Sequence, residues 1–206
     1  MTTHPLRLKP GTVVVFEGLD QTGKSTQADR LRETLAPDSA AFLHLPTGAT
    51  PFSNSVAELL ESPTSRPATA FAIQLAHLSS HADTMPELAR AAAHKGLVLD
   101  RWWWSTVAYG WFGGSLAETG ISEGGFRELV NTVWRPIRPS IVFVFLHPHH
   151  PDPHNSDAVA AGYRALVNED PQLAVFVAAD TIANTQAFIA GELVKRELVL
   201  KAGKEA

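Results

Sequence analysis

The sequence predicts an α/β protein in which a parallel sheet of five strands lies between two layers of helices. Short runs of apolar and β-branched residues recur along the chain, and longer segments with helical spacing separate them. Such strands are apolar on both faces, which is typical of a parallel sheet covered by helices. A chain of 206 residues with 45% hydrophobic content is long enough for one such core, so we expect residues 1–206 to form a single domain.

The expected elements alternate in chain order. We expect strands at residues 12–17, 40–45, 96–100, 141–146 and 174–178. We expect helices at residues 25–35, 53–60, 68–93, 122–134, 157–168 and 185–200. Pro86 is a point at which the long third helix could break, because proline lacks the N–H group that an inner helical turn uses.

The composition argues against several classes of protein. The net charge is −4 and the basic residues form no dense run, so we expect no nucleic-acid partner. The chain has no cysteine, which excludes disulfides and agrees with a cytoplasmic protein. No apolar run approaches the roughly 20 residues that a membrane span needs, and the first ten residues lack the apolar stretch of a signal peptide, so we expect no membrane association.

A phosphate-binding motif follows the first expected strand. The segment from Gly18 to Ser25 reads G-x-x-x-x-G-K-S, with an apolar strand before it and a helix after it. The glycines let the backbone N–H groups turn toward an anion, and the start of the helix adds partial positive charge. Lys24 would reach the β- and γ-phosphates of ATP, and the Ser25 hydroxyl would bind Mg²⁺. The predicted ATP-binding residues are Gly18, Gln21, Thr22, Gly23, Lys24, Ser25 and Thr26.

An acid and an arginine come at the end of the third expected strand. Asp100 and Arg101 lie at the carboxyl edge of the sheet, where open α/β sheets bind their ligands. Asp100 could hold Mg²⁺ through water, and Arg101 could bind a phosphate or neutralise charge during its transfer. A surface ion pair is the alternative reading of these two residues.

Two segments resemble the thymidylate kinases, a family of P-loop nucleotide kinases. FEGLDQTGKSTQ, which contains Asp20, is similar to the family's F-E-G-x-D-x-x-G-K-[ST]-T-Q segment, and LDRWWWSTVAYG is similar to its D-R-[YFW]-x-x-S-x-x-A-[YF] segment. The resemblance implies the predicted three-layer fold, a homodimer, and a catalytic role for Asp20 beside the acceptor sugar and for Arg101. It further implies that Trp102, Ser105 and Tyr109 contact the substrate, and that the stretch ending at Asp180 packs on adenine.

The sequence departs from the family pattern near the acceptor. The segment from Leu45 to Ala49 offers no arginine for the acceptor phosphate, and the long helix lacks the arginine that reads thymine in the family. Phe71 could instead stack on a base, and Gln74 could pair with its edge, an arrangement that resembles the deoxynucleoside kinases. A surface or capping role is the alternative for Gln74.

The largest departure is the lid, which in family members supplies arginines to the transferring phosphoryl group. Here the lid-like loop at residues 147–157 contains neither Arg nor Lys, and Gln21 stands where some members have an arginine. Either Arg101 does more of this work or turnover is slow. Four histidines in the loop invite two further readings, a metal site or a substitute lid: His147, His149, His150 and His154.

These observations predict a kinase that uses ATP and Mg²⁺ to phosphorylate a nucleoside monophosphate, with dTMP as the leading acceptor. Two alternatives stay open. One is a deoxynucleoside kinase that acts on a 5′-hydroxyl, although Leu45 stands where such enzymes carry a glutamate base. The other is a nucleotide-binding protein with little kinase activity, suggested by the lid without arginine.

Overall fold

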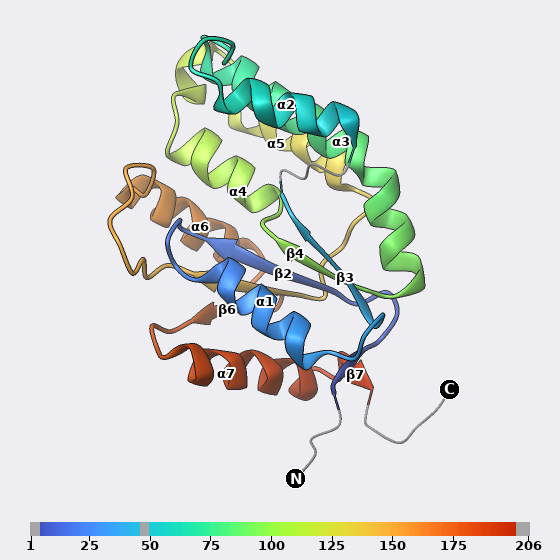
Figure 1. Ribbon diagram of the computed structural model, residues 1–206. Helices are drawn as coiled ribbons and strands as arrows, with labels where there is room; N and C mark the ends of the chain where they lie inside the picture. The colour runs from blue at the N-terminus through green and yellow to red at the C-terminus, as the bar shows by residue number, and fades with distance from the viewer. Residues whose placement is uncertain (1–4, 46–49, 201–206) are drawn as a thin grey trace.

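A five-stranded parallel sheet forms the centre of the protein. The computed structural model describes residues 5–45 and 50–200. The strands lie in the order β3-β4-β2-β5-β6 (Figure 1), and every neighbouring pair is parallel. Their bounds are β2 (Val13–Gly18), β3 (Ala40–His44), β4 (Gly96–Asp100), β5 (Ile141–Phe145) and β6 (Ala174–Val177). The predicted fold class is confirmed, and each strand lies within about a residue of its expected place.

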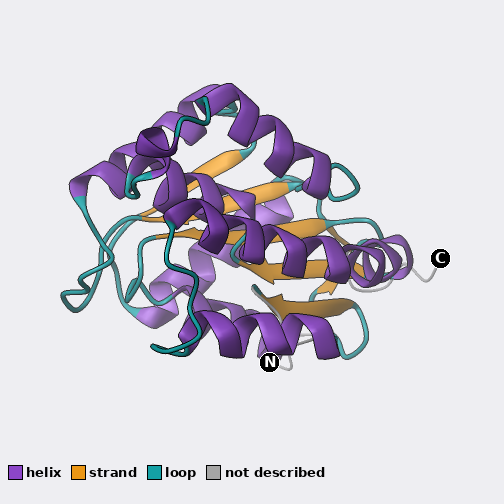
Figure 2. Cartoon of the chain, turned by 90° about the horizontal axis from the view of Figure 1, so that it is seen from above, coloured by secondary structure: helices purple, strands orange, loops and turns teal. Residues whose placement is uncertain are grey.

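Helices cover both faces of this sheet (Figures 1 and 2). One face carries α1 (Lys24–Thr34) and α7 (Ile182–Lys195), which contact each other. The other face carries α3 (Ala70–His94), α4 (Trp103–Val107), α5 (Glu123–Trp134) and α6 (Asp157–Glu169), while α2 (Pro51–Glu61) packs on α3. The three-layer arrangement is therefore the predicted one.

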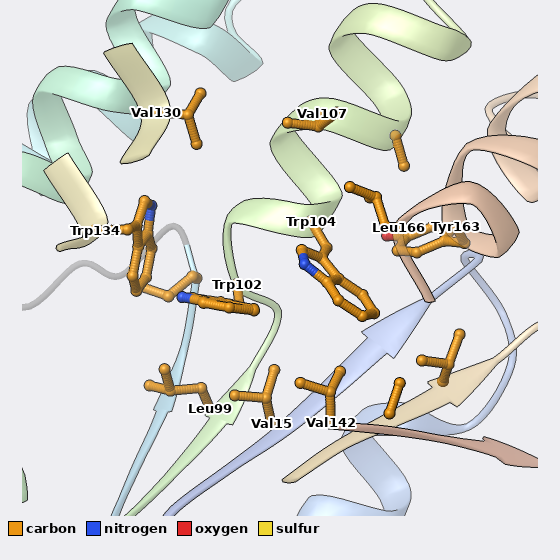
Figure 3. Close-up of a cluster of buried hydrophobic side chains, with 14 of the residues drawn as sticks. Val15, Leu99, Trp102, Trp104, Val107, Val130, Trp134, Val142, Tyr163 and Leu166 are labelled. Atoms are coloured by element: carbon orange, nitrogen blue, oxygen red, sulfur yellow. The ribbon is translucent and has the colours of Figure 1, made fainter. Parts of the chain in front are cut away.

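The alternation of side chains along β2 explains why both layers are needed. Val13 and Val15 belong to the core under α3 to α6, whereas Val14 and Phe16 belong to the core under α1 and α7. All six residues of β2 are buried, as expected for a central parallel strand. On the first of these faces, the indoles of Trp102 and Trp104 lie over a row of side chains from the sheet, Leu99, Val15 and Val142 (Figure 3).

The C-terminal helix ends earlier than the sequence predicts. We expected a helix to residue 200, but α7 stops at Lys195, and β7 (Val199–Leu200) pairs antiparallel with β1 (Arg7–Leu8). Glu197 has a φ of 56°, a left-handed conformation that ends a helix. The prediction failed because the pairing partner, β1, lies far away in sequence.

The long helix does not break at Pro86. Proline removes one backbone donor, but α3, which is 25 residues long, continues past it to His94. Met85 and Leu88 on either side are buried in the core, and this packing holds the helix together.

Among the described residues, no helix is both long and apolar enough to cross a membrane.

The segment after β4 contains helical structure that the sequence did not predict. The short α4 leads directly into a π-helical turn, η1 (Ala108–Phe112), in which the Gly113 N–H donates to the Ala108 carbonyl at 2.9 Å. A 3₁₀ turn, η2 (Leu116–Thr119), follows. Single π-turns of this kind are frequent at functional sites, and this one contains Tyr109.

Candidate functional site

The phosphate loop joins β2 to α1 at the carboxyl edge of the sheet. Gly18 has a φ of 131°, and a Cβ atom added there would lie 2.0 Å from the Phe145 carbonyl oxygen, so no other residue fits. Gly23 caps α1 in the left-handed region, with a φ of 84°. No side chain caps this helix and its first turn holds no acid, which suits an anion at the helix N-terminus.

Lys24 lies folded against the loop that it follows. Its Nζ donates to the Leu19 carbonyl and lies 3.4 Å from the Thr22 hydroxyl. The pKa of Lys24 is lowered to about 8, mainly by burial and also by the nearby Arg101 guanidinium, while Asp100 acts in the opposite direction. The ammonium group of the predicted phosphate-binding lysine is thus held against the loop by a backbone oxygen and a hydroxyl oxygen.

Ser25 and Asp100, the two residues predicted to hold Mg²⁺, lie in contact. The Ser25 hydroxyl donates to Oδ2 of Asp100 at 2.5 Å, and Nδ1 of His44 lies 2.9 Å from the same oxygen. Burial raises the pKa of Asp100, but hydrogen bonds from His44 and Ser25 outweigh it and lower the pKa overall. The other carboxylate oxygen, Oδ1, is buried without a partner.

This donor set fits Mg²⁺. The ion usually takes one or two protein oxygens and completes its shell with water and phosphate oxygens. A hydroxyl and a carboxylate with an unpaired buried oxygen offer that chemistry. Within the described parts of the chain, no group of three or more His, Cys, Asp or Glu residues could hold a metal by itself, and the four histidines of the 147–157 loop do not form such a group.

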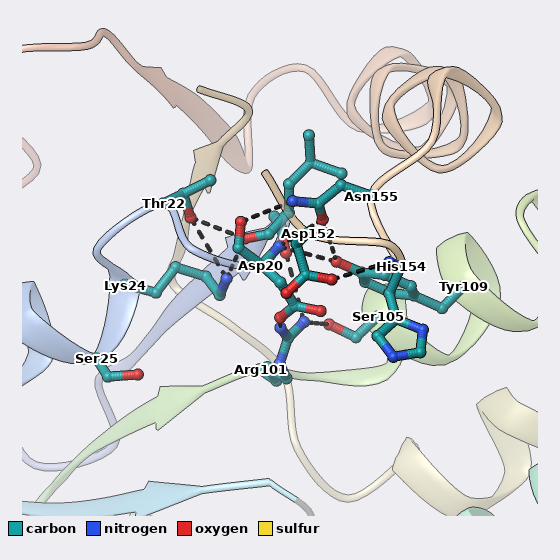
Figure 4. Close-up of polar contacts among 12 residues, drawn as sticks. Asp20, Thr22, Lys24, Ser25, Arg101, Ser105, Tyr109, Asp152, His154 and Asn155 are labelled. Atoms are coloured by element: carbon teal, nitrogen blue, oxygen red, sulfur yellow. Dashed lines mark hydrogen bonds and ion pairs between the residues drawn. The ribbon is translucent and has the colours of Figure 1, made fainter. Parts of the chain in front are cut away.

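Asp20 and Arg101 form an ion pair between the phosphate loop and the end of β4 (Figure 4). The Arg101 guanidinium also donates to the Ser105 hydroxyl at 2.9 Å and lies over the Tyr109 ring. Burial alone would lower the pKa of Arg101, but neighbouring Tyr163 and Asp20 raise it above its usual value. Arg101 therefore stays charged beside the phosphate loop.

Glu17 is a buried carboxylate that the sequence analysis did not single out. It binds Ser105, which in turn accepts a hydrogen bond from Arg101. Glu17 is fully buried, and its Oε1 accepts hydrogen bonds from the backbone N–H groups of Trp102 and Ser105, at 2.8 and 2.9 Å. Its Oε2 accepts from the Ser105 hydroxyl at 2.5 Å and the Tyr163 hydroxyl at 3.1 Å. Burial raises the pKa of Glu17, while the bond from Ser105 lowers it. The sequence did offer one indication of this buried site, because Glu17 is a charged residue inside an otherwise apolar strand.

Asn155 is a second residue that the sequence analysis missed. Its side chain forms two hydrogen bonds with the backbone of Asp20, both 2.8 Å long, and His149 of the same loop donates its N–H to the Gln21 carbonyl at 2.8 Å. The lid-like loop at residues 147–157 is therefore attached to the phosphate loop. No periodic pattern in the sequence could have indicated Asn155, because the loop has no regular secondary structure.

Three adjoining pockets surround the phosphate loop. The phosphate-loop pocket, of about 340 Å³, is lined by the loop from Asp20 to Thr26 together with His44, Asp100 and Arg101. The α7-side pocket, of about 120 Å³, is lined by Thr22, Gly23 and Thr26, by residues 177–180 and by parts of β5, α7 and the 147–157 loop. The α3-side pocket, of about 280 Å³, shares Asp20, His44 and Arg101 with the phosphate-loop pocket.

Most predicted binding residues line one of these pockets. The predicted adenine-side residue Asp180 lines the α7-side pocket, where its carboxylate accepts hydrogen bonds from Thr181 and Asn184. The α3-side pocket contains Gln74, Trp102, Ser105 and Tyr109. Gln74 packs on Gly110, because a Cβ atom added to Gly110 would lie 2.8 Å from Cδ of Gln74.

Phe71 is not among the described residues that line the α3-side pocket; it packs against the hydrophobic core. Leu45 lines that pocket, while positions 46–49 of the same segment lie outside the described residues.

The histidines divide between the two side pockets. His147 and His149 line the α7-side pocket, and a Cβ added to Gly23 would lie 3.4 Å from Nε2 of His149. His154 lines the α3-side pocket, together with His44, His77 and His81. Burial lowers the pKa of His81 to about 3, so its imidazole is neutral near pH 7.

The fold and the site together define a P-loop kinase, with a phosphate loop between two side pockets. The family model described as thymidylate kinase matches residues 16–148. The chain belongs to the thymidylate kinase family.

Individual relatives agree with this assignment. The chain is 31% identical to the thymidylate kinase of Chromobacterium violaceum over 88% of its own length and 93% of the relative. It is also 31% identical to that of Chlorobaculum parvum, over 64% of this chain and 59% of the relative.

Two solved structures share the fold. The thymidylate kinase from Ehrlichia chaffeensis superposes with a TM-score of 0.71 at 21% identity, over 89% of this chain and 98% of that one. The Candida albicans thymidylate kinase gives 0.65 at 19% identity, over 93% and 96% of the two chains.

Proposed function

We propose that this protein transfers the γ-phosphoryl group of MgATP to a deoxynucleoside monophosphate, and that dTMP is its acceptor. The observation that carries this proposal is the order of the pockets. The phosphate-loop pocket shares Thr22 and Gly23 with the α7-side pocket on one side, and Asp20 and Arg101 with the α3-side pocket on the other. A phosphoryl donor and an acceptor in the two side pockets would have their phosphates in the space between them.

The phosphoryl donor would lie across the α7-side pocket and the phosphate loop. Its adenine would pack on residues 177–180, and the loop N–H groups and Lys24 would hold the β- and γ-phosphates. Ser25 and Asp100 would hold Mg²⁺, which supplies charge neutralisation when bound. Catalysis in this site would consist of positioning and charge neutralisation.

The acceptor would occupy the α3-side pocket. Arg101 would bind its phosphate, because this guanidinium is charged, mostly buried and oriented by Ser105 and Asp20. Asp20 would lie beside the sugar. Gln74 and Trp102 line the same pocket and would contact the base, and Gln74 could pair with its edge through both amide groups.

A second candidate function is nucleotide binding with little turnover. The 147–157 loop contains no arginine or lysine. Because cations at the transferred phosphoryl group are worth on the order of a thousandfold in rate, this loop favours a slow enzyme or an inactive one. A deoxynucleoside kinase is less well supported, since the apolar Leu45 lines the α3-side pocket where a general base would be needed.

The homodimer and the cytoplasmic location stay predictions. Phe52 and Leu59 on α2 and Leu75 on α3 are large apolar residues that are 49%, 38% and 41% exposed. Because α2 and α3 pack on each other, these side chains support a self-association surface on this pair of helices. Sedimentation at several protein concentrations tests it, and a monomer at high concentration would contradict the homodimer.

The experiment that tests the proposed function measures ADP release from MgATP. The acceptor panel contains dTMP, dUMP, dCMP, dAMP and the corresponding nucleosides. Lys24→Ala serves as the blank, and Lys195→Ala, an exposed lysine on α7, is the matched control. Turnover of dTMP above the blank supports the proposal, whereas a preference for nucleosides contradicts it. ATP binding without turnover of any acceptor supports the second candidate.

A further inference from the structure

The 147–157 loop is fastened to the phosphate loop by hydrogen bonds within the chain. Oδ1 of Asn155 accepts from the Asp20 N–H, and Nδ2 of Asn155 donates to the Asp20 carbonyl, both at 2.8 Å (Figure 4). The side-chain amide therefore satisfies the donor and the acceptor of a single residue. His149 supplies a third bond through its N–H to the Gln21 carbonyl.

The local conformation of the loop directs Asn155 toward Asp20. Oδ1 of Asp152 accepts from the His154 N–H at 2.8 Å, and the Asp152 carbonyl accepts from the Asn155 N–H at 3.1 Å. The next residue, Ser156, caps α6. A turn stabilised by an aspartate on one side and a capped helix on the other thus hold Asn155 in place.

Asn155 and Arg101 contact different parts of Asp20. Asn155 and the Tyr109 hydroxyl contact the backbone of Asp20, at 2.8 and 3.0 Å, while Arg101 pairs with its carboxylate. Asp20 and Arg101 line both the phosphate-loop pocket and the α3-side pocket. A shift of the 147–157 loop would therefore move the charged pair on which the acceptor pocket depends.

We propose that Asn155 is a positioning residue that fixes a lid without arginine or lysine on the phosphate loop and orients Asp20 and Arg101 for the acceptor. This inference rests on the proposed function. The attachment leaves His149 beside Gly23 in the α7-side pocket and His154 in the α3-side pocket. One side-chain amide thereby connects the loop that lines both side pockets to the phosphate loop.

Steady-state kinetics with dTMP and MgATP test the proposal. Asn155→Ala removes both bonds to Asp20, and we expect the KM for dTMP to rise about tenfold and kcat to fall, while the KM for MgATP changes by less than about threefold. Asn155→Asp places a carboxylate oxygen against the Asp20 carbonyl. We expect the KM for dTMP to rise at least as much in this variant as in Asn155→Ala. His150→Ala is the control, because His150 is exposed and lies in the same loop.

Amide hydrogen exchange gives a reading that does not depend on activity. In the protein without nucleotide, we expect the N–H groups of His149 and Asp20 to exchange faster in Asn155→Ala than in the wild type, and His150→Ala to match the wild type. Wild-type kinetics and wild-type exchange in Asn155→Ala would overturn the proposal while leaving the proposed function intact. A general rise of every KM together with loss of stability would also overturn it, since that pattern indicates a merely structural role.

Failure of the proposed function and failure of the proposal for Asn155 give different results. If the wild type turns over no acceptor, the proposed function fails, and exchange alone decides the role of Asn155. Faster exchange at His149 and Asp20 in Asn155→Ala then supports the attachment of the lid, and unchanged exchange refutes it.

Discussion

The hydroxyl of Ser25 donates to Oδ2 of Asp100 at 2.5 Å, which joins the start of α1 to the end of β4. Seventy-five positions separate these residues in the sequence. They meet because β2 and β4 are parallel neighbours, so that the loops after both strands emerge at the same edge of the sheet. The predicted magnesium ligands are therefore brought together by the strand order.

Replacing Asp100 tests this assignment. Asp100→Asn keeps the shape of the side chain and removes its charge, so we expect the Mg²⁺ concentration for half-maximal ADP release to rise about tenfold or more. Magnesium titration at saturating ATP provides the measurement. Asp29→Asn, on the exposed face of α1, is the control. An unchanged magnesium requirement would remove Asp100 from the metal site.

The shape of the Arg101 guanidinium should matter as much as its charge. Arg101→Lys keeps the charge but cannot contact Asp20, Ser105 and a phosphate together. We expect the KM for dTMP to rise by about tenfold to a hundredfold, with a smaller change for MgATP. Arg90→Lys, on the exposed side of α3, should behave as the wild type. If the lysine variant has a normal KM for dTMP, Arg101 does not bind the acceptor phosphate.

Glu17 should contribute mainly to stability. Glu17→Gln places an NH₂ group among four hydrogen-bond donors, and it removes a carboxylate that interacts electrostatically with Arg101. We expect the free energy of unfolding to fall by about 1–3 kcal/mol. Urea unfolding measures this change, with the exposed Glu128→Gln as the comparison. Equal stability of the two variants would show that the carboxylate is not required.

His81 should make the protein sensitive to mild acid. Its pKa is about 3 in the folded protein, because burial disfavours the charged ring, and about 6.5 in the unfolded chain. The unfolded state binds the proton first, so the stability contributed by a neutral His81 is present above pH 6.5 and is lost as the pH falls toward 3. Between pH 7.5 and pH 5, this loss amounts to about 2 kcal/mol.

The measurement compares pH dependence rather than stability at a single pH. His81→Asn should show a shallower fall in the free energy of unfolding between pH 7.5 and 5 than the wild type. The neighbouring His77, whose pKa burial also lowers, keeps its own contribution in both proteins. His94→Asn, at the exposed end of the same helix, should keep the wild-type slope. Parallel curves for His81→Asn and the wild type would contradict the prediction.

The sequence alone determined the sheet, the phosphate loop and the family resemblance. The strands around Val15 and Val142 are buried on both faces, so their composition marks them without knowledge of their neighbours. Gly18, Lys24 and Ser25 belong to a local motif, and their spacing is enough to predict a phosphate-binding loop between a strand and a helix. Asp100 and Arg101 could be placed because the first ends a recognisable strand and the second directly follows it.

Only the tertiary structure decided which distant residues act together. Glu17 and Tyr163 meet across 146 positions, and Asn155 reaches Asp20 across 135, through contacts that no local pattern encodes. The division of the histidines between two pockets likewise depends on the path of a loop without periodicity. Hydrogen bonds between remote segments form only after the core has brought the chain together, so a single sequence shows the residues but not their partners.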